Sequence, residues 1–192
     1  MKKTIVLAAA VALAAGFAPA KAMDVNAQLM ELAESQLSGW LNNDELMAAL
    51  ATQNAAHANL SQDEIDALDQ TWRGEISGTS APMINEILNR PASGYLRDQK
   101  EAMDGLVTEV FLMDNRGLNV AQSDLTSDYW QGDEAKFQET YGQGAGSIHI
   151  SEVELDESTG TYQSQVSMVV ADPATGAPMG AITFGVNVDY LN

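Results

Sequence analysis

The spacing of apolar residues divides the chain into two parts. Between residues 24 and 104, apolar residues recur every three or four positions, which is the period of a helix with one buried face. After Gly105 the period falls to two, which is typical of strands that bury one face. The pattern therefore predicts an α+β fold, with a helical region at residues 23–105 followed by a stranded region at residues 106–192.

The helical region contains several start signals. Ser61 and Glu64 have the spacing of a capping box, and an apolar stripe follows at Ile65, Leu68 and Trp72. An earlier apolar run extends from residue 29 to residue 41, and further helices are expected around residues 46–50, 80–88 and 92–103. We expect these helices to include a long one that packs against the sheet formed by the second half.

The stranded region predicts a five-stranded antiparallel sheet. The expected strands are Glu109–Met113, Leu118–Ser123, Ser147–Leu155, Thr161–Val170 and Met179–Val188. Short turn sequences such as residues 114–117 join most of them, and such turns favour hairpins between antiparallel strands. The second and third strands are joined instead by a long connection, which includes a short helix near Glu134–Thr140.

The two faces of this sheet differ in character. In the last strand Ile182, Phe184 and Val186 point to one face, which we expect to pack on an N-terminal helix. The other face carries small or polar residues, namely Ser123, Gln165, Ser167 and Thr183. Small side chains leave room above a sheet, so a pocket is expected between this face and the long connection. The alternative is that the connection packs onto the sheet and fills that room itself.

The long connection carries the residues expected to complete the pocket. Tyr129 and Trp130 are predicted to form its walls, because such rings combine apolar area with a polar tip. Lys136 is predicted to neutralise an anionic group of the ligand. For a cationic ligand, Asp124 or Asp128 would take that role.

The first 22 residues have the pattern of a signal peptide. Lys2 and Lys3 precede an apolar run from Ile5 to Phe17, and Ala20-Lys21-Ala22 matches a cleavage site with small residues. We predict cleavage after Ala22 and a periplasmic location. No later apolar run is long enough to cross a membrane, so the mature chain is not expected to insert into one.

Composition excludes several kinds of function. There is no cysteine, which rules out disulfides and thiolate chemistry. The 27 acidic residues all follow Ala22, where only six basic residues lie, so the mature chain has a net charge of −21 and is not expected to bind nucleic acid. No phosphate-binding or metalloprotease motif occurs, and His57 and His149 are interpreted as structural. We therefore expect no catalysis, no cofactor and no metal.

Three segments of the second half resemble a known family. They read VFLMDNRGLNVAQSD, DYWQGDEAKF and SEVELDESTGTYQSQVSMVVADPATGAPMGAITFGVNV, and the match that they belong to covers roughly residues 106–191. This order is similar to that of the extracytoplasmic PAS-like sensor modules called Cache domains. The resemblance implies a five-stranded antiparallel sheet, a long N-terminal helix behind it, and a small-molecule pocket under the aromatic loop.

The resemblance also implies a ligand class and a set of site residues. Such modules commonly bind amino acids, small carboxylates or amines. By position, Tyr129, Trp130 and Lys136 fall in the ligand-binding loop, and three strand residues face the pocket; they are Gln165, Ser167 and Thr183. Typical members are tethered to an output domain, whereas this sequence reaches Asn192 just after its last strand. We therefore expect a sensor module that works with a separate membrane receptor or kinase. The alternative is a structural or interaction protein whose pocket is filled by its own side chains.

Overall fold

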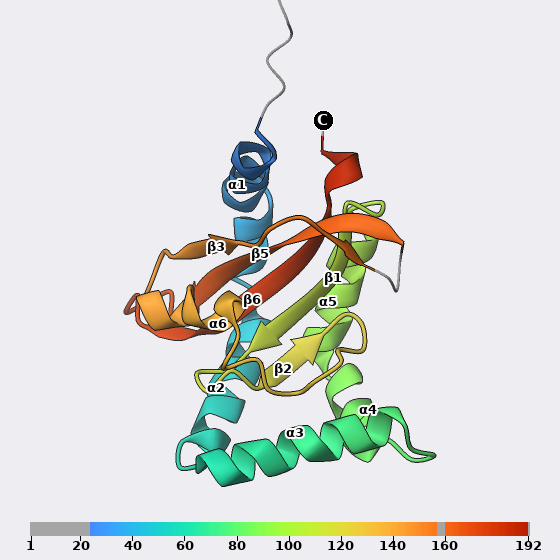
Figure 1. Ribbon diagram of the computed structural model, residues 1–192. Coiled ribbons are helices and arrows are strands. Elements are labelled where there is room, and N and C mark those ends of the chain that lie inside the picture. Colours follow the sequence, from blue (N-terminus) through green and yellow to red (C-terminus); the bar gives the residue numbers. More distant parts are fainter. Residues whose placement is uncertain (1–23, 157–159, 192) are drawn as a thin grey trace, which may run out of the picture.

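The computed structural model describes residues 24–156 and 160–191 of the protein (Figure 1). The predicted signal peptide at residues 1–22 lies outside these residues. Within the described ranges, none of the helices combines the length and the hydropathy needed to cross a bilayer.

The first half of the described chain is helical, as predicted. Its helices are α1 (Val25–Ser35), the 3₁₀ helix η1 (Leu37–Trp40), α2 (Asp44–His57), α3 (Gln62–Ile76), α4 (Pro82–Leu88) and α5 (Pro91–Glu101). The capping box at the start of α3 is present: the Ser61 hydroxyl accepts from the Glu64 backbone N–H, and the Glu64 carboxylate accepts from the Ser61 N–H. The last of these helices ends shortly before the first strand begins at Val107.

The second half forms one antiparallel sheet, which confirms the predicted fold class. Its strands are β1 (Val107–Met113), β2 (Asn119–Gln122), β3 (Ile148–Ile150), β4 (Glu154–Asp156), β5 (Thr161–Ala171) and β6 (Pro178–Asn187). The order across the sheet is β2-β1-β6-β5-β3, and β4 also pairs with β5. The long connection contains α6 (Ala135–Gln138) and the short η2 (Tyr141–Gln143), and η3 (Val188–Tyr190) follows the last strand.

One predicted strand is divided in two. The segment expected as Ser147–Leu155 forms β3 and β4, with a break at residues 151–153. At the break the Ser151 hydroxyl accepts a hydrogen bond from the Gln165 N–H at 2.8 Å, and the Ser164 hydroxyl donates to the Ser151 carbonyl at 2.8 Å. Side-chain hydrogen bonds thus replace part of the regular backbone ladder, a competition for which serine is well suited.

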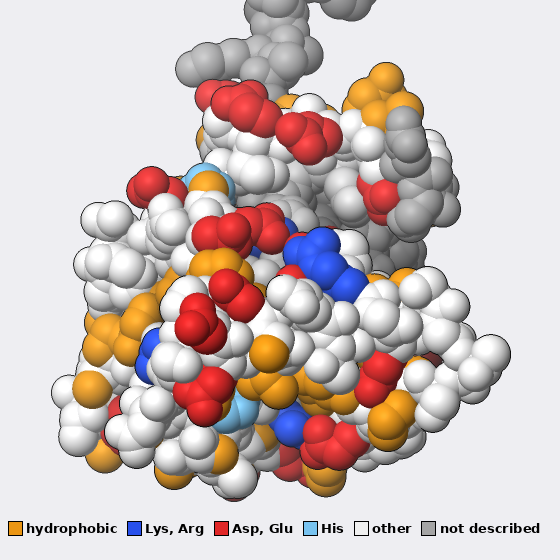
Figure 2. All heavy atoms as spheres, turned by 60° about the horizontal axis from the view of Figure 1, so that its bottom comes forward, with side chains coloured by type: hydrophobic (Ala, Val, Ile, Leu, Met, Phe, Trp, Pro, Cys, Tyr) orange, Lys and Arg blue, Asp and Glu red, His pale blue; other side chains and the backbone are white. Residues whose placement is uncertain are grey.

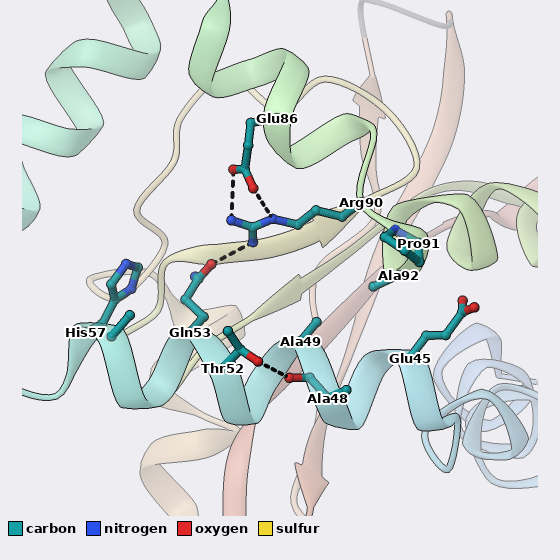
Figure 3. Close-up of a pocket in the computed structure, with 11 residues that line it drawn as sticks. Glu45, Ala48, Ala49, Thr52, Gln53, His57, Glu86, Arg90, Pro91 and Ala92 are labelled. Atoms are coloured by element: carbon teal, nitrogen blue, oxygen red, sulfur yellow. Dashed lines mark hydrogen bonds and ion pairs between the residues drawn. The ribbon is translucent and has the colours of Figure 1, made fainter.

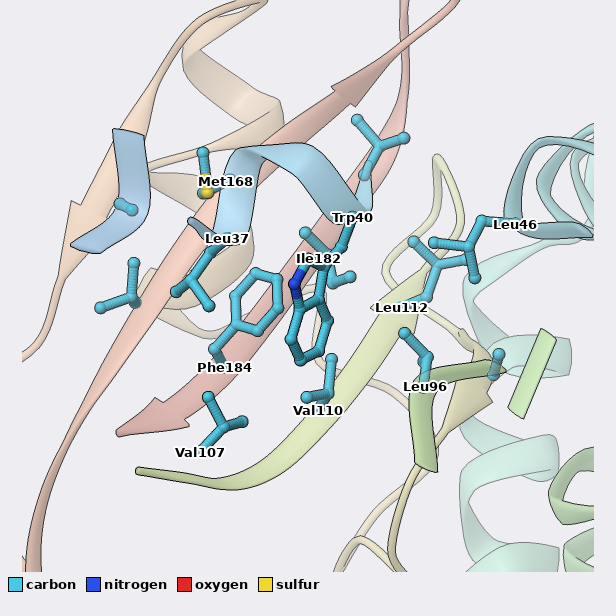
Figure 4. Packing of buried hydrophobic residues seen from close by; sticks show 14 of the residues in the cluster. Leu37, Trp40, Leu46, Leu96, Val107, Val110, Leu112, Met168, Ile182 and Phe184 are labelled. Atoms are coloured by element: carbon cyan, nitrogen blue, oxygen red, sulfur yellow. The ribbon is translucent and has the colours of Figure 1, made fainter. Parts of the chain in front are cut away.

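Helices α1, α2 and α5 cover one face of the sheet, and the largest core lies between them (Figures 1 and 4). Phe184 of β6 is fully buried there, and its ring meets the Trp40 ring edge to face at a centroid distance of 5.4 Å. Ile182 and Val186 belong to the same cluster. The alternation of apolar residues in the last strand therefore identified the helix-covered face correctly.

Helices α3 and α4 form a separate layer at the end of the sheet near β2 (Figure 1). A second core lies between this layer and the long connection, and it includes Ile65, Trp72, Ile87, Leu118 and Tyr129. Figure 2 brings this end of the molecule forward and shows acidic side chains spread over it, with few basic ones among them.

Candidate functional site

The opposite face of the sheet carries a cavity of about 440 Å³ under the long connection. Its floor comes from β1 and β5, which contribute Glu109, Phe111, Gln163 and Gln165. Successive side chains of a strand point to opposite faces of the sheet. Val110 and Leu112 of β1 point into the helix-side core, so Glu109 and Phe111 point into the cavity. The volume lies within the range of about 300–1,000 Å³ that is usual for small-molecule sites.

The walls of this sheet-side cavity come from three other segments. The connection supplies Leu125, Thr126, Ser127, Asp128, Gln131 and Lys136; the end of α3 supplies Ile76; and β4 supplies Asp156. Leu125 and Ile76 are 49% and 41% exposed. Large apolar side chains this exposed at the mouth of a cavity would gain from being covered by a ligand.

Lys136 is the one basic side chain among the described residues that line this cavity. Its ammonium lies 2.9 Å from a Glu134 carboxylate oxygen, 3.2 Å from the Gln131 side-chain oxygen and 5.4 Å from the centre of the Phe111 ring. Only 14% of the side chain is exposed. An ammonium has three donors, so one further hydrogen bond to a ligand can be made without breaking the two present.

Glu109 supplies a carboxylate on the cavity floor. Burial raises the pKa of this carboxyl above its ordinary value, while a hydrogen bond from Gln165 and the charge of Lys136 lower it less strongly. The Gln165 amide donates to it at 3.3 Å. Asp156 and Asp128 add negative charge to the same cavity, and Asp128 is held by the Gln131 amide at 2.6 Å and by Arg73 at 3.3 Å. The cavity thus contains one cationic group and several carboxylates.

The raised pKa of Glu109 leads to a pH-dependent prediction. A carboxyl with a raised pKa in the folded state favours folding below its unfolded pKa, and this contribution is lost as the pH rises through the folded value. We expect the free energy of unfolding of Glu109→Gln to be at least as high as that of the wild type at pH 7. The difference between the two proteins should shrink as the pH is lowered toward 4. Urea unfolding at several pH values measures it, with the exposed Glu152→Gln as the control for net charge. A Glu109→Gln protein whose relative stability falls as the pH rises would contradict it.

Three of the eight site residues predicted from sequence line this cavity, namely Lys136, Asp128 and Gln165. Ser167 and Thr183 lie on the same face but are fully buried and bond to each other, with their hydroxyl oxygens 2.9 Å apart. Near them the Phe137 and Tyr141 rings stack at 5.1 Å and pack against Phe111. The connection therefore fills this part of the face with its own side chains and leaves the cavity beside it open.

The two aromatic residues of the loop lie elsewhere. Tyr129 is buried and stacks on Trp72 of α3 at a centroid distance of 5.5 Å, and burial raises the pKa of its phenol. The Trp130 indole donates to the Arg116 carbonyl at 2.9 Å. Asp69 of α3 accepts from the backbone N–H of both residues. These contacts attach the connection to α3 and so position the neighbouring residues 125–128 and 131, which line the cavity.

Ser123 also has a structural position rather than a place in the cavity lining. Its hydroxyl accepts from the Val110 N–H at 2.8 Å and lies 2.6 Å from an Asp124 oxygen. The lining residues that sequence reasoning missed are Ile76, Glu109, Phe111, Leu125, Thr126, Ser127, Gln131, Asp156 and Gln163. The period of two contained a signal for part of them, because Gln163 shares a face with Gln165, and Glu109 is a charged residue within an apolar strand.

Comparison with known proteins returns no matching family model and no curated protein. Among solved structures, the sensory domain of the Campylobacter jejuni chemoreceptor Tlp3 is 17% identical, with a TM-score of 0.41 over 86% of this chain and 66% of that one. The sensor domain of the V. cholerae histidine kinase DctB is 18% identical, with a TM-score of 0.37 over 85% of this chain and 57% of that one.

The ligand-binding domain of the Pseudomonas fluorescens chemoreceptor CtaA, solved in complex with L-alanine, is 12% identical, with a TM-score of 0.39 over 81% of this chain and 62% of that one. The chain thus spans less than two thirds of the length of each of these three proteins. All three of these solved chains are sensory or ligand-binding domains.

Proposed function

We propose that the protein is a periplasmic, non-catalytic sensor module that binds a small amino acid in the sheet-side cavity and acts with a separate membrane receptor or kinase. The observation that carries the proposal is the presence of Lys136 and Glu109 in the lining of one cavity. An amino acid has one carboxylate and one ammonium group. Lys136 suits the first, and Glu109, with Asp156 nearby, suits the second.

The excess of carboxylates favours a zwitterion over a simple carboxylate. A ligand with only negative charge would meet Lys136 but would also be repelled by the carboxylates of Glu109, Asp128 and Asp156, which line the same cavity. The negative field of the whole protein adds to that cost. The ligand's ammonium removes the repulsion and supplies a charged donor to Glu109. The apolar rim at Leu125 and Ile76 favours an aliphatic side chain.

A thermal-shift screen of amino acids, organic acids and amines tests the proposal. A ligand at 100 times its dissociation constant should raise the free energy of unfolding by about 2.7 kcal/mol. Each amino acid should stabilise the wild type more than the matching acid, which lacks the ammonium, and more than the matching amine, which lacks the carboxylate. In Glu109→Gln the amino acid should stabilise the protein no more than the matching acid does. Absence of stabilisation by any amino acid would favour an interaction protein without a ligand.

Such an interaction protein is the second candidate. The observation that favours it is the stacked pair Phe137 and Tyr141, which already fills part of the sheet face, together with the ion pair that Lys136 makes with Glu134. In this case the remaining cavity holds only water. The wild type and Lys136→Met would then show no stabilisation by any compound of the screen.

Export of the protein is a separate prediction. The charged start, apolar run and small-residue site of residues 1–22 predict removal of this segment by signal peptidase. We expect protein isolated from the periplasm to begin at Met23, and N-terminal sequencing measures this directly. Recovery from the cytoplasm of the native host with Met1 still present would contradict the prediction.

A further inference from the structure

A second hollow of about 560 Å³ lies on the helical side of the molecule, between α2 and the junction of α4 with α5 (Figure 3). Small side chains line most of it, including Ala48, Thr52 and Ala56 on α2, and Pro91 and Ala92 on α5. We call it the α2–α5 groove. It shares no lining residue with the sheet-side cavity, so binding in this groove is independent of the proposed function.

A chain of hydrogen bonds runs along the groove. Glu86 accepts from the Arg90 guanidinium at 2.9 and 3.0 Å, and the same guanidinium donates to Gln53 and to the Val120 carbonyl at 2.7 Å each. Gln53 donates to Asp114 at 3.0 Å, and Asp114 lies 2.7 Å from His57. Three carbonyls around β2 are satisfied by this chain, which fixes its side chains in place.

The hydrogen bonds of Arg90 determine which part of it remains for a ligand. Four of its five N–H donors are used, and all of them lie in the plane of the guanidinium. Its contribution to an occupant of the groove is therefore mainly its flat face. Guanidinium faces stack well on aromatic rings. The Ala and Pro side chains nearby leave the space that a ring needs.

His57 offers a second point of recognition. Asp114 is fully buried, and its carboxylate oxygen, which can only accept, lies 2.7 Å from His57 Nδ1, so the neutral tautomer that fits this contact carries its proton on Nδ1. The other ring nitrogen, Nε2, is then an acceptor in a side chain that lines the groove. Glu45 and Glu86 line it as well, and Glu45 is exposed, so an anion is disfavoured.

We propose that the α2–α5 groove binds a neutral, planar aromatic molecule that carries an N–H donor. Its ring stacks on the face of Arg90, and its N–H donates to His57 Nε2. Because the groove is open, it accepts rings of different size. The class of ligand is therefore defined by a flat ring, the lack of negative charge and an N–H donor. Indole is the simplest probe with these properties, 1-methylindole lacks only the donor, and indole-3-acetate adds a negative charge.

The test combines calorimetry with mapping of backbone NMR shifts on the purified protein. Indole should bind, with shifts centred on residues 48–57 and 90–92, and 1-methylindole should bind about 2- to 13-fold more weakly, the equivalent of one neutral hydrogen bond. Indole-3-acetate should also bind more weakly than indole. Thr52→Trp fills the middle of the groove with a ring and should abolish indole binding.

Ala55→Trp is the matched control, because Ala55 is exposed on the same helix but does not line the groove. Both variants replace exposed residues, and thermal melting verifies that each is folded. Equal indole binding by Thr52→Trp and the wild type would overturn the proposal. So would absence of binding up to the solubility limit, or shifts confined to Glu109, Phe111 and their neighbours.

Discussion

Replacing Phe184 with alanine is expected to lower the free energy of unfolding by about 3–5 kcal/mol. Phe184 is fully buried at the centre of the largest core, where its ring meets Trp40 and lies in one cluster with Val107 and Ile182. The smaller side chain leaves a cavity that helices α1, α2 and α5 cannot close, since they are fixed by several strands at once. Urea unfolding followed by circular dichroism measures the loss.

Tyr162→Ala is the control for this prediction. Tyr162 lies on β5, the strand next to Phe184, but is 53% exposed, so its removal should cost less than about 1 kcal/mol. A Phe184→Ala protein as stable as the Tyr162→Ala protein would show that the contact between helices and sheet is not the main core of the molecule.

Replacing Lys136 with methionine is expected to weaken binding of the best amino acid by about 10- to 150-fold. This range corresponds to one charge-assisted hydrogen bond of about 1.5–3 kcal/mol. Methionine keeps an apolar side chain of similar length while it removes the ammonium, which lies 5.4 Å from the centre of the Phe111 ring. Isothermal titration calorimetry with the ligand found in the screen measures the change.

Lys100→Met is the matched control, because it makes the same chemical change at a residue that does not line the cavity. Lys100 lies on α5, and its ammonium pairs with Asp124 at 2.7 Å. Its loss should leave affinity within about 2-fold of the wild type, since it gives up only an exposed ion pair. Equal weakening by both variants would mean that overall charge, and not a contact with Lys136, governs affinity.

The sequence predicted the fold class because local patterns and tertiary packing agree in this protein. The alternation in β6 separates the face that meets Trp40 from the face that meets the connection, and the Ser61–Glu64 capping box marks the start of α3. The third predicted strand was wrong in its continuity. It is interrupted where the hydroxyls of Ser151 and Ser164 form hydrogen bonds, and in the sequence these two serines cannot be told from ordinary strand residues.

The candidate site was predicted in part. Lys136 and Gln165 line the cavity because period two and the length of the connection place them over the same face. Tyr129 does not, because an aromatic ring in a loop can pack to either side, and the choice depends on where Trp72 of α3 lies. No pattern within the stranded half contains that information. Glu109 stands out as a charged residue in an apolar strand, but nothing in the sequence places Lys136 and Gln165 beside it.

The most direct test of the proposed function is a crystal structure of the protein with the amino acid that stabilises it most. It should show the ligand carboxylate within hydrogen-bond distance of Lys136 Nζ and its ammonium within hydrogen-bond distance of the Glu109 carboxylate, with its side chain against Leu125 and Ile76. An amino acid bound elsewhere on the molecule, or bound in the sheet-side cavity without a contact to either Lys136 or Glu109, would contradict the proposed function.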